Sequence, residues 1–192
     1  MPRLGMEPIR RDALVQATIA EIGAAGSLDV TVGQIARRAG MSSALAHHYF
    51  GGKDQIFLAA MRHILTAYGT SVRAALRGAP GPRDRLSRLV HVNFNDENFR
   101  PEVIAAWLTF YVQAHTVPEA GRLLQVYQRR LRSNLLFALR PLCGNRAEGV
   151  ADLLGALIDG LYLRAALGGA ADGRAAALQV LDLLDRLLET RP

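Results

Sequence analysis

The sequence predicts an all-α fold for this chain of 192 residues. Three observations favour it: apolar residues recur at helical spacings, β-branched and aromatic residues never gather into alternating runs, and Pro and Gly separate the periodic segments. Half of the residues are hydrophobic, so a substantial core can form without disulfides or structural metals. We expect a three-helix unit over residues 1–53, followed by a larger helical unit over residues 54–192.

Four helices are expected in the first part of the chain. One apolar stripe over residues 9–25 predicts the first helix, which the run AAGS ends. Thr31 is expected to cap a short second helix that Gly40 ends. Ser42 is expected to cap the third, SALAHHYF, which a Gly-Gly pair ends. The fourth is long and amphipathic, over residues 53–77.

Prolines mark the expected starts of three further helices, because the first turn of a helix does not need the N–H that Pro lacks. Pro82, Pro101 and Pro118 each stand at such a position. Two apolar helices, separated by the run GGAADG, are expected to complete the chain. The expected ranges of these five helices are 82–95, 101–115, 118–140, 146–167 and 173–189.

Composition narrows the classes of protein that the chain can belong to. A net charge of +6 permits a polyanionic partner, although it is also typical of a solubilising surface. The single cysteine, Cys143, excludes an intramolecular disulfide and is expected to be an inert core thiol. The N-terminus has no apolar signal core, and no run approaches the ~20 apolar residues of a membrane span. We expect a soluble, cytoplasmic protein with no membrane partner.

Residues 31–50 are predicted to form a helix-turn-helix unit, with a tight turn at Gly40 and Met41. In such a unit the second helix enters the DNA major groove, with its N-terminal residues at the base edges. Small residues there permit a close approach, hydroxyls can bond phosphates or bases, and histidine and tyrosine rings add further donors. Phe50 is expected to turn inward. The candidate DNA contacts on this helix are Ser42, Ser43, Ala44, His47, His48 and Tyr49.

The chain contains 22 arginines and one lysine, Lys53, which follows two glycines. The glycines let a DNA backbone come close, and Lys53 opens a helix whose free N–H groups attract an anion. Lys53 and Thr31 are therefore candidate phosphate contacts. Taken alone, Lys53 is more typical of a solvated surface cation beside Asp54, but its place in the 31–53 pattern favours the phosphate.

No enzymatic or metal-binding pattern is present in the sequence. Adjacent residues on a helix point about 100° apart, so His47 and His48 cannot readily share one ion, and the other histidines lack ligand spacing. The sequence also lacks a G-x-S-x-G elbow, a phosphate loop and a dinucleotide-binding glycine pattern. We expect no metal, no cofactor and no catalytic activity.

The 31–54 segment resembles the TetR family of bacterial repressors, whose pattern is a Thr-opened helix, a G-[VM]-S turn and an aromatic-rich end followed by K-[ED]. The sequence departs from this pattern at His47, where tyrosine is common, and at Ala44, where glycine is usual. The matching residues are Thr31, Ile35, Ala36, Gly40, Ser42, His48, Tyr49, Phe50, Lys53 and Asp54.

This resemblance implies a helix-turn-helix DNA-binding domain at 1–53 and a helical effector-binding and dimerisation domain at 54–192. It also implies a homodimer that represses transcription from double-stranded operator DNA. The runs NFNDENFRPEVIAAWLTFY, RRLRSNL and LIDGLYLR resemble a branch of the family that responds to choline and controls glycine-betaine synthesis genes. Choline or a related quaternary ammonium is the implied effector. Another small ligand is the alternative, because domains of this type also occur in regulators with other effectors.

Five of the twelve aromatic residues fall within residues 94–111. Trp107, Phe110 and Tyr111 share one helix face by their spacing. A group of aromatic faces suits a quaternary ammonium, which is attracted to ring quadrupoles and has no N–H to donate. Ordinary helix packing is the alternative for any single ring. The candidate ligand residues are Phe94, Phe99, Trp107, Phe110, Tyr111, Tyr127, Asp159 and Tyr162, where tryptophan is common in the choline-responsive branch.

Asp159 is an acid inside the apolar run GVADLLGALIDGLYL, where burial requires a compensating partner. That partner could be a cationic ligand, or an internal arginine such as Arg164. A position on the helix surface is also possible.

The last two helices combine apolar faces with small residues, so each copy of the chain could dock against a second copy. A monomeric core is the competing account of those faces. For the whole chain, the alternatives to a sequence-specific repressor are a helical ligand-binding or metabolic protein with a structural N-terminal bundle, and a nonspecific basic DNA binder.

Overall fold

The computed structural model describes residues 5–26, 29–168 and 172–189, and these residues form nine α-helices and one short 3₁₀ helix, η1. The all-α prediction is confirmed. None of the helices in these residues is long and apolar enough to cross a membrane. The bounds are α1 Met6–Ala25, α2 Val32–Arg38, α3 Ser43–Phe50, α4 Lys53–Leu76, α5 Pro82–Asn93, α6 Pro101–Thr116, α7 Pro118–Cys143, η1 Gly144–Arg146, α8 Ala147–Ala166 and α9 Gly173–Glu189.

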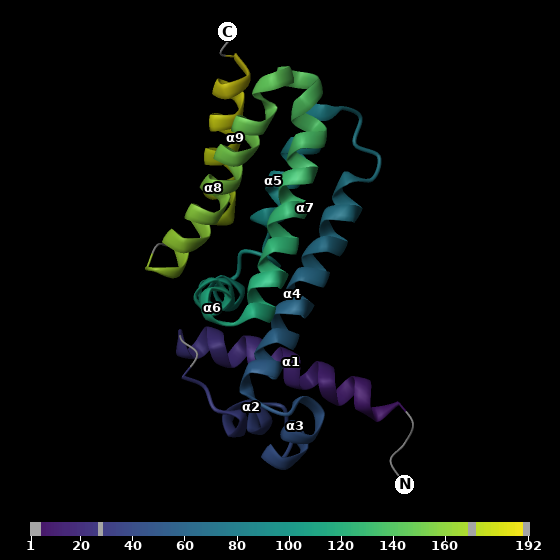
Figure 1. The fold of residues 1–192 in the computed structure, drawn as a ribbon, viewed down its shortest axis with the longest axis vertical. Coiled ribbons are helices and arrows are strands. Elements are labelled where there is room, and N and C mark those ends of the chain that lie inside the picture. Colours follow the sequence, from purple (N-terminus) through teal and green to yellow (C-terminus); the bar gives the residue numbers. More distant parts are fainter. Residues whose placement is uncertain (1–4, 27–28, 169–171, 190–192) are drawn as a thin grey trace.

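Two groups of helices are stacked along the long axis of the molecule (Figure 1). α1 crosses that axis, and α2 and α3 lie beyond it at one end. The helices α4, α5, α7, α8 and α9 run along the axis, and α4 passes from α3 into this second group. α1 contacts both α4 and α6. A shift of α6 or α4 can therefore be transmitted to α1 and to the small helices that it carries.

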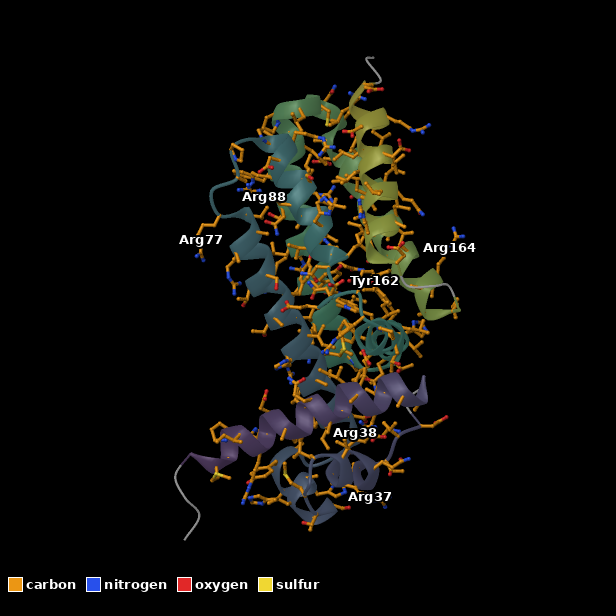
Figure 2. All side chains as sticks on the ribbon, turned by 180° about the vertical axis from the view of Figure 1, so that it is seen from behind. Arg37, Arg38, Arg77, Arg88, Tyr162 and Arg164 are labelled. Carbon is orange, nitrogen blue, oxygen red and sulfur yellow. The ribbon has the colours of Figure 1, made fainter. Side chains whose placement is uncertain are left out.

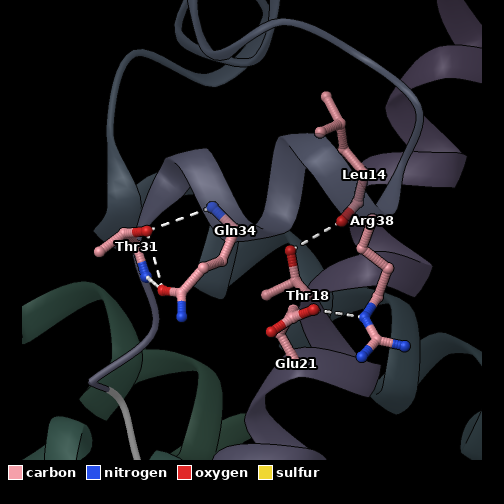
Figure 3. Close-up of polar contacts among 6 residues, drawn as sticks. All are labelled: Leu14, Thr18, Glu21, Thr31, Gln34 and Arg38. Carbon is pink, nitrogen blue, oxygen red and sulfur yellow. Dashed lines mark hydrogen bonds and ion pairs between the residues drawn. The ribbon is translucent and has the colours of Figure 1, made fainter.

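The capping side chains fix the helix-turn-helix geometry, and Figure 3 shows the cap of α2 at Thr31 and Gln34. The Thr31 hydroxyl accepts the Gln34 amide N–H at 3.2 Å, and the Gln34 side chain accepts the Thr31 N–H at 2.7 Å. Ser42 caps α3 by accepting the Leu45 N–H at 3.2 Å. Gly40 has φ +67, a left-handed conformation that glycine adopts without strain, and it makes the turn. Both predicted N-caps are confirmed.

Three expectations about helix ends and burial need correction. α1 begins at Met6, three residues before the expected start, because Pro8 is tolerated in a first turn. α7 continues through Pro141 to Cys143, and Gly144, at φ +55, follows its last residue. Cys143 is half-buried rather than a core thiol, with its sulfur 3.4 Å from the Leu139 carbonyl oxygen.

One continuous core joins the two groups of helices. Its tightest point lies where α1 crosses α6. A Cβ placed on Gly23 of α1 would lie 2.7 Å from the Glu102 Cα of α6, which is closer than real Cβ contacts. The two backbones approach this closely because Gly23 has no side chain.

Candidate DNA interface and candidate ligand site

α3 presents one continuous exposed strip. Ser43, Ala44, His47 and His48 are all exposed, and their spacing places them along one face of the helix. Ala46, on the opposite face, is fully buried. The structure therefore brings together four of the six candidate contacts that the sequence placed on this helix, and Ser42 lies at its N-cap.

The C-terminal end of α3 is held by α1 and by its own last residues. Arg11 of α1 donates to the Tyr49 carbonyl oxygen at 2.7 Å, and its guanidinium carbon lies 4.4 Å from the centroid of the Phe50 ring. Phe50 is half-buried by this contact. His47 Nδ1 lies 3.0 Å from the Gly51 carbonyl oxygen. A cation at a helix C-terminus is electrostatically favourable, so these contacts orient the exposed strip.

The candidate phosphate contacts flank the strip. Thr31 is exposed at the start of α2, and Tyr49 is half-buried with its ring 5.5 Å from that of His48. Lys53 is the first residue of α4, and the cap residue Gly52 supplies no side-chain hydrogen bond to the free N–H groups there. In the residues that the structure describes, no carboxylate forms an ion pair with Lys53. Its charge is therefore available to an anion.

Sequence reasoning missed one candidate on α2. Arg37 is exposed and forms no ion pair within the described ranges, whereas its neighbour Arg38 pairs with Glu21 of α1 (Figures 2 and 3). Arg38 is thus used to fix α2 on α1, and Arg37 remains free to contact a phosphate. The sequence run IARRAG contains both arginines, but it does not show which of them forms an ion pair, because the partner Glu21 lies on α1.

An aromatic cluster occupies the middle of the second group of helices. The Trp107 ring centroid lies 4.6 Å from that of Tyr127, 5.7 Å from Tyr111 and 6.2 Å from Tyr162. Phe110 lies at the same helix face, 5.8 Å from Trp107, as the spacing predicted. Phe94 and Phe99 pack on the far side of Tyr162, at 5.9 and 4.9 Å. All seven predicted aromatic candidates therefore belong to one connected set.

Asp159 lies beside this cluster, and its hydrogen-bond partner in the described residues is a tyrosine rather than an arginine. The Tyr111 hydroxyl donates to Asp159 Oδ1 at 2.9 Å. No ion pair to Asp159 is formed by the described residues, and Arg164 is exposed at the outer side of α8 (Figure 2). Burial raises the pKa of the Asp159 carboxyl above its ordinary value, while the hydrogen bond from Tyr111 opposes that shift. Of the alternatives that the sequence left open for Asp159, an internal pair with Arg164 is not formed, and the role in ligand binding stays a prediction.

Two residues that sequence reasoning missed complete the polar side of the cluster. The Tyr68 ring lies 5.7 Å from that of Tyr127, and its hydroxyl donates to Asn93 Oδ1 at 3.2 Å. The Tyr162 hydroxyl contacts the carbonyl oxygens of Asn93 and, at 3.1 Å, Asn98. These contacts tie α8 to the segment between α5 and α6. Tyr68 and Asn93 lie on α4 and α5, so no local spacing connected them to Trp107.

The described residues hold no group of His, Cys, Asp and Glu side chains suited to a metal ion. The exposed candidate DNA contacts gather at the α2–α4 end, as the predicted helix-turn-helix unit requires. Comparison with known proteins tests that interpretation.

Two family models match the chain. Residues 14–60 match the model for bacterial regulatory proteins of the TetR family, and residues 82–189 match the model for the C-terminal domain of BetI-type transcriptional repressors. The chain belongs to the TetR family, in its BetI-type branch. It is therefore a transcriptional repressor, and the resemblance seen in the sequence is confirmed.

Curated relatives of this TetR-family chain are transcriptional regulators, not enzymes. An HTH-type transcriptional regulator BetI from Brucella suis is 52% identical over 95% of this chain and 92% of its own length. One from Agrobacterium fabrum is 50% identical over 100% of this chain and 94% of its own length.

Solved structures share the fold. A transcriptional regulator from Pseudomonas aeruginosa matches with a TM-score of 0.80 at 29% identity, covering 97% of this chain and 93% of its own. A regulator from Saccharomonospora viridis, solved in complex with choline, matches with a TM-score of 0.81 at 23% identity, covering 91% and 95%. At that identity the second likeness concerns the fold alone.

Proposed function

We propose that this BetI-type repressor recognises an inverted-repeat operator through α3 and releases or tightens that DNA in response to choline or a close relative. The observation that carries the proposal is the exposed strip of α3 in a chain whose family is established. The proposal assigns one role to each end of the molecule, with DNA at α2–α4 and the effector at the aromatic cluster.

Within the DNA interface, we assign base-edge contacts to Ser43, Ala44 and His47. Their strip faces away from α1 and holds only small or ring-bearing side chains, which permits a close approach to a groove. We assign phosphate contacts to Thr31, Tyr49 and Lys53, which flank the strip. Arg37 joins this second group as the free cation of α2. His48 is the fourth residue of the strip, and Ser42 lies beside it at the N-cap of α3, so both are further candidate DNA contacts.

Two recognition helices must be held at a fixed distance to read an inverted repeat, so the proposal requires a homodimer. The outer faces of α8 and α9 carry large apolar side chains with high exposure: Leu153 at 54%, Leu163 at 45% and Leu178 at 55%. Such side chains are unusual as a group on a monomer surface. We therefore assign the dimer contact to these two helices.

The effector assignment rests on chemistry and on family. Trp107, Tyr111, Tyr127 and Tyr162 present rings to one another around the Asp159 carboxyl, which combines ring quadrupoles with a potential anion. A quaternary ammonium is attracted by both. Membership of the BetI-type branch supports the same ligand class, and the S. viridis regulator solved with choline shares the fold.

The route from effector to DNA follows contacts already described. Tyr162 bonds the segment between α5 and α6, and α6 packs directly on α1 at Gly23. A ligand that separates the cluster rings shifts α8 or α6 and so tilts α1 with α2 and α3. Coupling of about 1 to 3 kcal/mol between the two sites changes DNA affinity by about 5- to 150-fold.

Calorimetric titration with choline, betaine aldehyde and glycine betaine tests the effector assignment. Choline is expected to bind the wild-type protein, and Trp107→Ala is expected to lose that binding. His48→Ala is a matched control, because it changes an exposed ring at the opposite end of the molecule. Absence of binding by all three compounds to a folded wild-type protein would reject the effector and leave the repressor intact.

Salt-dependent gel shifts on DNA upstream of the repressed genes test the DNA assignment. Specific binding is expected to exceed binding to scrambled DNA and to weaken as salt rises. Equal affinity for scrambled DNA would reject operator recognition, and no shift at low salt would reject DNA binding by this chain.

A further inference from the structure

A cavity of about 710 Å³ lies between α4 and α7 and borders the aromatic cluster at Tyr68 and Tyr127. This volume is within the range of about 300 to 1,000 Å³ that is typical of small-molecule sites. Its floor is apolar and includes the buried side chains of Val72, Leu131 and Tyr127. Tyr127 is the only residue common to this cavity and the predicted ligand set.

The charged residues of the cavity wall are all positive. Five arginines line it, and no Asp or Glu does so among the described residues. Four of the five, all except Arg85, are exposed, so they form a rim above the apolar floor. The five are Arg62, Arg73, Arg77, Arg85 and Arg130.

None of these five guanidinium groups forms an ion pair within residues 5–26, 29–168 and 172–189. Other arginines nearby do: Arg88 pairs with Asp84 at 2.6 Å, and Arg132 with Asp152 at 2.8 Å. Figure 2 places Arg77 and Arg88 at the same end of the molecule, although only Arg88 has a carboxylate partner. Arginines outside the cavity, such as Arg122 and Arg129, also form no ion pair in the described residues, so what distinguishes the cavity is that five cations gather on a wall without a carboxylate.

Arg85 gives an independent indication. Its Nε is buried and has no hydrogen-bond partner, and its Nη1 reaches the Leu76 carbonyl oxygen only at 3.4 Å. A buried donor without an acceptor is unfavourable by about 1 to 3 kcal/mol, so it favours any ligand that supplies an acceptor. The rim arginines also repel one another, weakly because four of the five are exposed to solvent, and an anion among them would offset that repulsion.

We propose that the α4–α7 cavity binds an amphiphilic anion, with its apolar chain on the floor at Val72 and Leu131 and its carboxylate or phosphate monoester among the rim arginines. A quaternary ammonium is excluded from this position by five like charges, so the site is separate from the one assigned to choline. The proposal does not depend on choline binding to the aromatic cluster.

The chain supplies a reporter for this site. Trp107 is its only tryptophan, and the Trp107 ring lies 4.6 Å from that of Tyr127, which lines the cavity. Titration with decanoate below its critical micelle concentration, without choline present, is expected to change the tryptophan emission saturably. Decanol has the same chain without the charge and is expected to bind at least about tenfold more weakly, because it cannot bond the arginines as an anion.

A matched pair of variants on α7 locates the headgroup. Arg130→Gln is expected to weaken decanoate binding by about tenfold. Arg129→Gln is expected to leave it unchanged, because Arg129 is also exposed on the same helix but does not line the cavity. Arg73→Gln provides a second rim variant on α4.

Titrations with decyl phosphate and inorganic phosphate identify the class of the anionic headgroup. Tighter binding of decyl phosphate than of decanoate would assign a phosphate ester, and the reverse would assign a carboxylate. The proposal is overturned if decanol binds as tightly as decanoate, or if inorganic phosphate binds as tightly as decyl phosphate. No decanoate binding to the wild-type protein, or equal binding by the Arg130→Gln and Arg129→Gln variants, also overturns it.

Discussion

The recognition strip of α3 and the aromatic cluster of the second group of helices place functional side chains in opposite ways. The strip consists of exposed residues on a single eight-residue helix, held from behind by the buried Ala46. The cluster consists of buried and half-buried rings from five helices or their ends, and each ring packs on the next. The strip can therefore change its chemistry at little cost to folding, whereas the cluster cannot. Substitutions can test this difference directly.

The largest expected effect is on the stability of the cluster. Phe110 is fully buried, so Phe110→Ala removes a ring and leaves a cavity that α6 cannot close, which lowers the free energy of unfolding by about 3 to 5 kcal/mol. His47→Ala on the exposed strip is expected to change that energy by less than about 0.5 kcal/mol. Urea denaturation of both variants checks the comparison. Similar losses in the two proteins would contradict it.

The next effect concerns the contact that joins the two regions. Gly23→Ala places a Cβ 2.7 Å from the Glu102 Cα, so α1 and α6 must separate. Overpacking of this kind costs about 1 to 3 kcal/mol. Gly69→Ala on α4 is the matched control, because its new Cβ meets only the flexible end of Arg73 at 3.5 Å. Its gain in helix propensity is expected to stabilise the protein by about 0.5 to 1 kcal/mol.

If Gly23→Ala also alters operator affinity while Gly69→Ala does not, the contact between α1 and α6 carries the coupling between the effector site and the DNA interface. Thermal denaturation and gel shifts on the same two proteins measure both quantities. A Gly23→Ala protein as stable as the wild type, with unchanged DNA binding, would exclude this contact as the route.

Most helix positions could be predicted from the sequence because their signals are local. Thr31 and Ser42 cap the helices that follow them through bonds three residues away, and Pro82 begins α5. The errors fell where a local rule permits two outcomes. A proline can lie in the first turn of a helix, as Pro8 does in α1. It can also lie within the last turn, as Pro141 does in α7.

The candidate-site residues also divide into those that local spacing predicts and those that long-range packing brings together. The Trp107 and Tyr111 pair follows from helical spacing, and the structure confirms their proximity. The partner of Asp159 does not follow from any spacing, since Tyr111 lies 48 residues away and on another helix. The Tyr68 contact with Tyr127 was missed for the same reason. Long-range packing decided these contacts, and a single sequence does not encode it in a visible pattern.

An effect on DNA binding rather than on stability is expected within the DNA interface, where two kinds of contact can be separated. Lys53→Ala removes a proposed phosphate contact, so it should weaken specific and scrambled DNA alike and reduce the salt slope by about 1. His47→Ala removes a proposed base-edge contact and should cost about 1 to 3 kcal/mol on the operator only. Gel shifts at several salt concentrations measure both. The assignment is wrong if Lys53→Ala changes the preferred sequence and leaves nonspecific affinity untouched.

The smallest expected effect is a pH dependence that arises from Asp159 in the ligand-free protein. Burial raises the pKa of this carboxyl in the folded state, so the folded protein holds the proton more tightly than the unfolded chain. The contribution of Asp159 to stability is therefore fully present below the ordinary pKa and is lost as pH rises through the raised one. Asp159→Asn cannot ionise and can still accept from Tyr111, so it should equal or exceed the wild-type stability at pH 7.

That advantage should disappear as pH falls from 7 toward 4, because the wild-type carboxyl then becomes neutral as well. Asp152→Asn is the control on the same helix: this carboxylate is exposed and pairs with Arg132 at 2.8 Å, so its removal should bring no gain at pH 7. Urea denaturation across this pH range gives the result. A constant difference between wild type and Asp159→Asn would show that Asp159 does not titrate in this window, and loss of stability at pH 7 would show that its charge is favourable where it lies.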